Sequence, residues 1–188
     1  INLQQAPPML ERIDAKAGAQ MTTDQRPLQI LFLGSRNAAR SQMAECLLNS
    51  IGSGRYKAHS AGILPASEVH PLAIELLKKN KLATDRLHCK DWQRFAPPGL
   101  LDLDVVVSVC ESPVEEINGK WPGNPLLAHW QHPDPVALAD EDGSMRRAFF
   151  HTYNQLVRRL TIFASLPLNK LDRDALKRRI DDIGRKGA

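Results

Sequence analysis

The stretch GSRNAARS, residues 34–41, has the residue types of an anion-binding turn. It follows the short apolar run LQILFLG, residues 28–34, and precedes a segment with helical spacing. The first amides of a helix lack intrahelical acceptors and carry partial positive charge, so a tight turn that feeds a helix favours an anion. Arg40 can bind two oxygens of a tetrahedral oxyanion, and Arg36 adds positive charge. Asn37 suits a turn position with positive φ.

We therefore predict that this turn binds an oxyanion. The expected anion-binding residues are Ser35, Arg36, Asn37, Ala38, Ala39, Arg40 and Ser41. The turn is not a nucleotide-binding Walker loop, because that motif needs a second glycine and a lysine where Ala39 and Arg40 stand. The alternative is that Gly34 only forms a turn and that Arg40 is a surface residue.

The segments around the turn predict an α/β fold. Strands are expected at 28–34, 56–62, 103–110 and 126–130, and helices at 41–51, 71–80, 144–166 and 169–183. The run 103–110 is the clearest strand, since three consecutive β-branched valines lie within it. Strands that alternate with helices favour a parallel sheet with helices on both faces, and ligands of such folds bind at the carboxyl ends of the strands.

Length and charge exclude several classes of protein. The 188 residues suit one globular domain with a short addition, and no apolar run reaches the roughly 18–20 residues of a membrane span. The segment from Lys170 to the end carries +3 of the net charge of +4 (seven basic minus four acidic residues), but its acids and bases interleave. With 5% aromatic residues as well, nucleic-acid binding is disfavoured.

Three regions are predicted along the chain. Residues 1–26 form an N-terminal extension, with one short helix near 9–16, and Met21 is an alternative natural start. Residues 27–167 form the main domain, and residues 168–188 form a C-terminal helix and tail. No secretory signal is recognised, and three widely spaced cysteines do not form a disulfide framework or a zinc cluster. A reducing cytoplasm is therefore expected.

Several motifs, in order, resemble the low-molecular-weight protein-tyrosine phosphatases and their relatives, the thiol-dependent arsenate reductases. They are LQILFLGSRNAARSQMAE at 28–45, HSAG at 59–62, PLAIELL at 71–77, the strand ending in Cys110, and HWQHPDP at 129–135. The segments SQMAE and HW…DP fit the arsenate-reductase branch better. The resemblance covers about residues 28–167 and implies a three-layer fold with a four-stranded parallel sheet in the order 2-1-3-4.

The resemblance also assigns roles to single residues. In that family the first residue of the turn is a cysteine whose thiolate attacks phosphorus or arsenic, but this chain has Gly34 there. Arg40 matches the arginine that grips the oxyanion, and Ser41 matches the serine that supports the thiolate. Asn37 matches the asparagine that shapes the turn. Asp134 matches the general acid for the leaving group, and Cys110 matches the resolving cysteine.

The thiol relay is incomplete at other positions too. Where relatives carry a third cysteine, this chain has Ile117 and Asn118, and Ala39 stands where some members have another cysteine. Arg36 replaces a small residue or histidine. The sequence therefore predicts a pseudoenzyme with a phosphatase-type P-loop, which binds phosphate or arsenate but is inactive or severely impaired.

Two alternatives remain open. One is an active arsenate reductase or tyrosine phosphatase, in which Gly34 replaces a natural cysteine or another residue supplies the chemistry; the other is a scaffold without a ligand. No cofactor and no metal are expected. The expected partners are an inorganic oxyanion or phosphorylated ligand and a protein partner, with no nucleic acid and no membrane, in a monomer or homodimer.

The remaining histidines, cysteines and tryptophans are predicted to be structural. His59, His129 and His132 lack the spacing of metal ligands, and Cys46 lies among apolar residues of a helix. The tryptophans are expected in packing or at a cleft rim. A disulfide between Cys89 and Cys110 is the alternative that would restore some redox chemistry.

Overall fold

The computed structural model describes residues 26–96, 101–111, 121, 123–137 and 143–186. The predicted extension, except for its last residue, and the short helix near 9–16 lie outside the described residues. So do Ile117 and Asn118.

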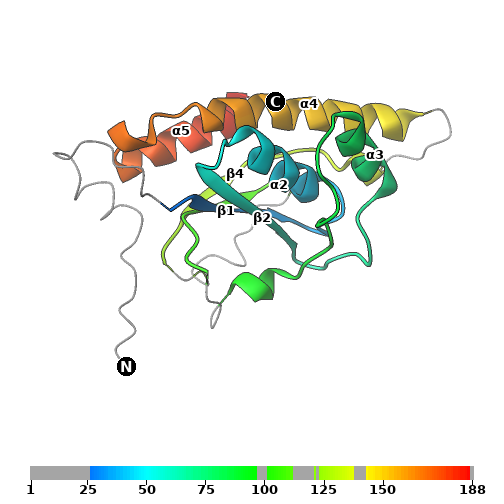
Figure 1. Cartoon of the computed structure of the whole chain (residues 1–188), viewed down its shortest axis with the longest axis horizontal. Coiled ribbons are helices and arrows are strands. Elements are labelled where there is room, and N and C mark those ends of the chain that lie inside the picture. Colours follow the sequence, from blue (N-terminus) through cyan, green and yellow to red (C-terminus); the bar gives the residue numbers. More distant parts are fainter. Residues whose placement is uncertain (1–25, 97–100, 112–120, 122, 138–142, 187–188) are drawn as a thin grey trace.

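The centre of the fold is a four-stranded parallel sheet (Figure 1). Its strands are β1 (Leu28–Gly34), β2 (Tyr56–Gly62), β3 (Val105–Ser108) and β4 (Leu126–His129). The strand order is β2-β1-β3-β4, so the predicted fold class and strand order are confirmed. Because all strands are parallel, their carboxyl ends meet at one edge of the sheet.

The register places the predicted chemistry along that edge. Gly34 pairs with Gly62, and one step earlier Leu33 pairs with Ser108 of the neighbouring strand. Ser108 in turn pairs with His129 at the end of β4. The turn after β1 and the segments that carry Cys110 and Asp134 therefore all leave the sheet from its carboxyl edge.

In the ranges that the structure describes, four α-helices follow the predicted segments. They are α2 (Arg40–Ile51), α3 (Pro71–Lys79), α4 (Ser144–Ala164) and α5 (Arg173–Lys186), with short 3-10 turns at Trp92–Phe95, Pro135–Ala137 and Leu168–Lys170. Pro71 begins α3, as its fixed φ favours. The C-terminal helix was predicted over 169–183 but begins later, because the Asp172 carboxylate caps it by accepting from the amide of Ala175 at 2.7 Å.

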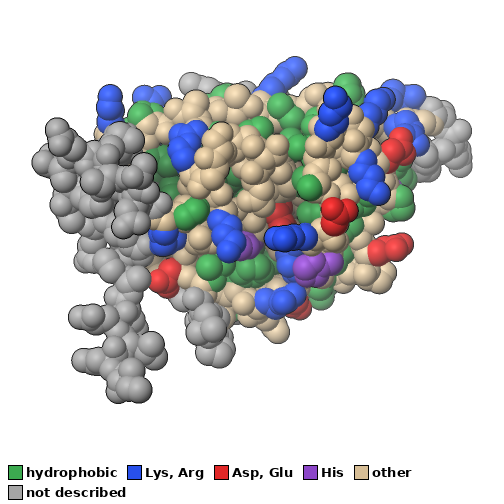
Figure 2. Space-filling model, viewed as in Figure 1, with side chains coloured by type: hydrophobic (Ala, Val, Ile, Leu, Met, Phe, Trp, Pro, Cys, Tyr) green, Lys and Arg blue, Asp and Glu red, His purple; other side chains and the backbone are tan. Residues whose placement is uncertain are grey.

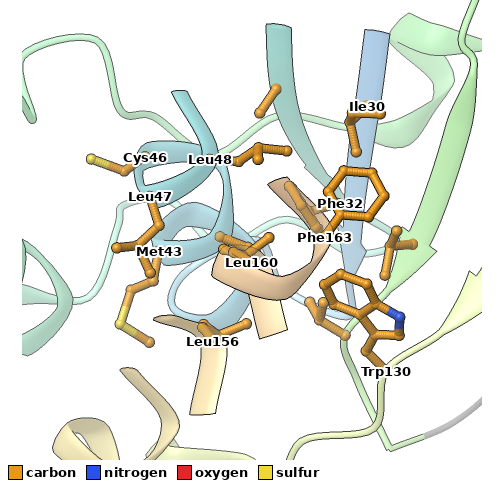
Figure 3. Packing of buried hydrophobic residues seen from close by; sticks show 14 of the residues in the cluster. Ile30, Phe32, Met43, Cys46, Leu47, Leu48, Trp130, Leu156, Leu160 and Phe163 are labelled. Carbon is orange, nitrogen blue, oxygen red and sulfur yellow. The ribbon is translucent and has the colours of Figure 1, made fainter. Parts of the chain in front are cut away.

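The two faces of the sheet are covered unequally. Side chains alternate along β1, so Ile30 and Phe32 join a large cluster with α2, α3, α4 and α5, whereas Leu31 joins a smaller cluster on the opposite face. Figure 3 shows the large cluster, in which Phe32 lies beside the tryptophan of residue 130. Within the described residues, the smaller cluster is covered by the 3-10 turn Trp92–Phe95 and neighbouring loop residues, so the expectation of α-helices on both faces is not met there.

The strand predicted over 103–110 is longer than the observed β3. At its start, Asp104 pairs with Gln29 through its own amide, but its carboxylate also accepts from the Gln29 amide at 2.8 Å. A side chain thus takes the place of a backbone acceptor, which ends the regular ladder. At the other end, the Val109 amide still donates to the Leu33 carbonyl before the chain leaves the sheet.

The C-terminal helix α5 is packed onto the large cluster. Leu176 and Ile180 are buried within that cluster, and the indole N–H of Trp130 donates to the Ile180 carbonyl at 2.9 Å. Among the described residues, no helix combines the length and apolar character that crossing a membrane would require.

Candidate functional site

The turn after β1 is held in shape by its carbonyl groups. The carbonyls of residues 34, 35, 36 and 38 accept from amides of residues 63, 64, 66 and 70 at 2.8–3.1 Å. In a trans peptide the carbonyl and the following N–H point in opposite directions. The amides of Ser35, Arg36, Asn37 and Ala39 therefore point away from the 63–70 segment.

The backbone N–H groups of the turn are not engaged by the part of the chain that the structure describes. Among the described residues, no hydrogen bond is formed by the backbone N–H groups of residues 35–39. Helix α2 begins at Arg40, one residue before the predicted start, and Ala39 precedes it without a side-chain cap. Unpaired amides at the start of a helix form a concave, electropositive surface of the kind that anions occupy.

Asn37 fixes the middle of the turn. Its φ of 52° lies in the left-handed region that asparagine tolerates, which confirms the predicted positive φ. Its side-chain nitrogen donates to the Ser41 hydroxyl at 2.9 Å, and its side-chain oxygen accepts from the amide of Lys90 at 2.7 Å. The side chain is 1% exposed, so it braces the turn against α2 and the 88–90 segment.

Two residues that the sequence reasoning did not single out support the same turn. Gln42 is fully buried and donates from its side-chain nitrogen to the Asn37 carbonyl and to the His88 carbonyl. Gly62 lies so close that a Cβ there would be 2.9 Å from the Asn37 nitrogen and 3.0 Å from the Arg36 carbonyl carbon. Two signals in the sequence could have revealed these residues. One is the glycine of the HSAG segment, and the other is a polar residue inside an otherwise apolar helix.

Arg40 lies between the turn and the segment after β4. It is 7% exposed, and its guanidinium donates to the His132 carbonyl at 2.7 Å. Its other terminal nitrogen is 3.4 Å from the Asp134 carboxylate and 3.5 Å from the Ser35 hydroxyl, which are long contacts. The guanidinium is thus anchored by one strong bond and retains weakly engaged donors.

The turn forms one wall of a cleft of about 400 Å³. We call this the loop cleft; it is lined by residues 34–41, Ala66, Ser67, Glu68, His70, Pro71, Asp134, Val136 and Ala137. The structure therefore brings Gly34, the whole predicted anion-binding set and Asp134 to one cavity. Asp134 is half-buried, and its carboxylate also accepts from the Val136 amide at 3.3 Å.

His70 is a further lining residue that sequence reasoning missed. Its Nδ1 accepts from the Leu72 amide at 3.2 Å and so caps α3, while its ring stacks on Phe149 with centroids 4.7 Å apart. Since Nδ1 is the acceptor, the neutral ring carries its proton on Nε2. A histidine placed directly before the favourable helix start at Pro71 was the sequence signal.

Gly34 is the last residue of β1, and its backbone does not require glycine. Its φ lies outside the left-handed region, and a Cβ built there would be 3.1 Å from the Ser41 hydroxyl and 3.5 Å from the Ser41 Cβ. A Cβ at residue 34 would therefore need a shift of only a few tenths of an ångström in Ser41.

The three thiols lie outside the cleft lining. Cys110 is buried and follows β3 at the same edge of the sheet, but it is not among the residues that line the loop cleft. Cys89 donates its S–H to the Asn37 carbonyl at 3.2 Å, and burial raises its pKa. All three cysteines are free thiols, so the structure does not contain the alternative disulfide between Cys89 and Cys110.

Cys46 belongs to the core, as predicted. It is 8% exposed, and burial, followed by the charge of Glu45, raises the pKa of its thiol to about 11. A thiol with that pKa is protonated at neutral pH, and protonated thiols are poor nucleophiles.

Next to Arg40, Arg159 and His132 form a buried polar cluster, in which the Arg159 Nε has no partner among the described residues. Arg159 is 1% exposed and donates to the Gln131 carbonyl at 3.0 Å, the His132 Nε2 at 2.7 Å and the Gly184 carbonyl at 2.9 Å. The His132 Nδ1–H then donates to the side-chain oxygen of Gln155 at 3.0 Å. Burial, then the positive charge of Arg159, lowers the pKa of His132 to about 3. This histidine is structural, as predicted.

The other predicted structural histidines also have partners in the fold. His59 bonds through Nε2 to the side-chain oxygen of Gln29 at 2.9 Å, and His129 bonds through Nδ1 to the Ser108 hydroxyl at 2.6 Å. Burial lowers the pKa of both. Among the described residues, no group of histidines, cysteines and carboxylates has the arrangement of a metal site.

Most of the chain matches a family of known proteins. The family model described as low molecular weight phosphotyrosine protein phosphatase matches residues 29–176. The chain belongs to this family. It is 31% identical over 107 residues to a glutaredoxin arsenate reductase from Synechocystis sp. (strain ATCC 27184 / PCC 6803 / Kazusa), covering 57% of this chain and 78% of that protein.

Solved structures of similar fold include enzymes of two kinds. An arsenate reductase in its phosphate-binding state is 25% identical, with a TM-score of 0.56, over 71% of this chain and 96% of that chain. A low molecular weight protein tyrosine phosphatase from T. tengcongensis has a TM-score of 0.58 over 71% of this chain and 95% of that chain. At 19% identity, the second similarity concerns the fold alone.

Proposed function

We propose that the loop cleft binds a tetrahedral oxyanion, phosphate or arsenate, and that the chain has lost the thiol-dependent turnover of its relatives. The observation that carries the proposal is the set of amides at residues 35–39, which have no acceptor among the described residues and lie beside the Arg40 guanidinium. A similar arsenate reductase has been solved in a phosphate-binding state, which supports the same ligand class here.

The proposed binding depends on groups that remain in this chain. Backbone amides need no particular side chain, and Arg40 supplies a charge-assisted fork whose strong anchor is a neutral carbonyl rather than a carboxylate. An oxyanion in the cleft would replace the long contacts that Arg40 makes with Asp134 and Ser35. We propose that Ser41 and Asn37 act indirectly, because their mutual hydrogen bond holds the turn.

The proposed loss of turnover follows from Gly34. Thiol catalysis divides one difficult displacement into two easier ones, and glycine offers no atom that can form the intermediate. Removing a catalytic nucleophile costs on the order of 10⁴–10⁶ in rate. We propose that Asp134 keeps the general-acid position, and that Cys110 keeps the resolving-cysteine position, without a sulfur adduct on which either can act.

Equilibrium binding tests the first part of the proposal. Titration calorimetry with phosphate, arsenate and sulfate is expected to give binding that Arg40→Ala weakens by about 10- to 100-fold, the value of a charged hydrogen-bonding pair. Arg178→Ala, an exposed change on α5 remote from the cleft, is the matched control and should leave affinity within twofold. Equal binding by the Arg40 variant and the unchanged chain would rule out the cleft as the site.

Activity assays test the second part. The unchanged chain should neither reduce arsenate, with dithiothreitol or glutathione plus glutaredoxin as reductant, nor hydrolyse 4-nitrophenyl phosphate above background. Turnover by the unchanged chain that disappears in Arg40→Ala would instead establish an active reductase or phosphatase with an unfamiliar nucleophile.

A further inference from the structure

A second concavity, of about 660 Å³, lies between α3 and α4. We call it the α3–α4 groove. Its apolar lining comes from Leu72 and Leu76 of α3 and from Phe149 and Phe150 of α4. Phe150 is 59% exposed, which places a large aromatic side chain in solvent at the groove. Exposed aromatic surface next to a concavity is typical of a binding surface.

The groove is rimmed by positive charge. Its charged lining residues are Glu75, Lys79, Arg146, Arg147 and Arg158, and Arg146 forms an ion pair with Glu75. Lys79 and Arg158 are exposed, and neither forms an ion pair with another described residue. Figure 2 shows Lys and Arg side chains standing over α3 and the neighbouring end of α4. The groove therefore combines an apolar floor with unneutralised basic groups.

Two side chains of the groove contact residues that line or support the loop cleft. Phe149 lines the groove and stacks on His70, which lines the cleft. Gln155 lines the groove and accepts from His132, whose carbonyl holds Arg40. A chain seated in the groove would therefore lie directly beside the cleft.

We infer that the α3–α4 groove docks a short acidic segment of a partner protein that carries at least one large apolar side chain. The apolar residue contacts Leu76 and Phe150, and carboxylates of the same segment face Lys79 and Arg158. Charge complementarity selects this occupant, because opposite charges steer association and like charges oppose it. A second copy of the chain, related by a two-fold axis through the groove, would bring the same basic rim against itself.

The inference does not depend on an oxyanion in the loop cleft. It rests on the groove's own lining and charge, so it can be tested on the ligand-free chain. The probe is a fluorescein-labelled peptide of about twelve residues, made of Glu with two Leu at helical spacing. One comparison peptide has Lys for each Glu, and another has Ser for each Leu.

Fluorescence anisotropy should show binding of the Glu/Leu peptide and much weaker binding of both comparison peptides. Phe150→Asp and the double change Lys79→Glu with Arg158→Glu should each weaken binding about tenfold or more. The matched controls are Ile162→Asp, a 52% exposed position of α4 outside the groove, and Arg178→Glu on α5. Both controls should remain within twofold, and circular dichroism should confirm that every variant is folded.

Three results would overturn the inference. The first is equal binding of the acidic and basic peptides, and the second is equal weakening by the control variants. The third is a concentration-dependent dimer in sedimentation that Phe150→Asp abolishes while peptide binding is absent, because the groove would then be an interface between two copies.

Discussion

Arg40 and Arg159 are two buried arginines that meet at the same histidine from different sides. Arg159 donates to the His132 ring and to two backbone carbonyls, all at 3.0 Å or less. Arg40 has one comparable bond, to the His132 carbonyl, and otherwise long contacts at the edge of the loop cleft. Burial alone therefore does not make an arginine structural. What matters is whether the chain itself supplies the acceptors.

The largest expected effect comes from placing a cysteine sulfur at residue 34, in the loop cleft beside Arg40. Gly34→Cys should raise arsenate reduction or 4-nitrophenyl phosphate hydrolysis by at least about 10³-fold, since a nucleophile is worth on the order of 10⁴–10⁶. Gly34→Ala adds the same Cβ without sulfur and serves as the control. An inactive Gly34→Cys variant that still binds phosphate would show that more than the sulfur has been lost.

A substitution of Arg159 should lower the stability of the fold. Arg159→Met removes the donor of two part-buried bonds to backbone carbonyls and of the buried bond to the His132 ring, so the free energy of unfolding should fall by about 2–4 kcal/mol. Urea unfolding measures this loss, and the phosphate affinity of the folded variant should change less than threefold. A stable variant with weakened phosphate binding would reverse the roles of the two arginines.

The buried His132 should also make the free energy of unfolding depend on pH. The folded pKa of His132 is about 3, well below the usual unfolded value of about 6.5, so the unfolded chain takes up the proton first. The contribution of His132 is present above pH 6.5 and is lost as pH falls towards 3. Between pH 7.5 and 5 the unfolding free energy should drop by about 2 kcal/mol from this group.

His132→Gln is the variant that isolates that contribution, since an amide can still accept from Arg159 and donate to Gln155. Its unfolding free energy, measured in urea at both pH values, should show a smaller drop than the unchanged chain. The lowered pKa values of His59 and His129 remain in both proteins and cancel in the comparison. Identical drops in the two proteins would exclude His132 as a source of the pH dependence.

A smaller effect, on phosphate affinity, is expected when a methyl group is added next to the backbone of the turn. Gly62→Ala would place a methyl group 2.9 Å from the Asn37 nitrogen, which forces the turn to move, and phosphate affinity should fall about tenfold. Its paired residue provides the control, because a Cβ in Gly34→Ala is tight only against the Ser41 side chain and lies 3.9 Å from the Asn37 nitrogen, so affinity should stay within threefold. Equal affinities for both variants would show that the turn adapts freely.

Much of the fold could be predicted because local patterns and packing agree. The run 28–34 and the run 56–62 are strands with the predicted bounds, and Pro71 begins the predicted helix. Two of the misplaced bounds occur where one side chain replaces a backbone partner, as Asp104 does at the start of β3 and Asp172 does before α5. Such substitutions depend on which segment lies opposite, and spacing along the chain does not reveal that.

In the candidate site too, local features could be predicted from the sequence and long-range contacts could not. Residues 34–41 stand out in the sequence because turn chemistry and a helix start are local properties. Gln42, Gly62 and His70 were missed because their roles depend on contacts with the turn across the fold. The groove between α3 and α4 was missed for a similar reason, since it arises only when two distant helices are set side by side.

By itself, the sequence determined the order of the elements, the polar turn after the first strand and the absence of a side chain at residue 34, because each is a local property. The tertiary structure alone decided that the turn's carbonyls are engaged by residues 63–70 while its amides find no acceptor in the described parts of the chain. It also decided that Arg40 reaches a carbonyl 92 residues away while Arg159 is fully enclosed. The physical reason is that an acceptor's position in space depends on how the sheet and helices assemble.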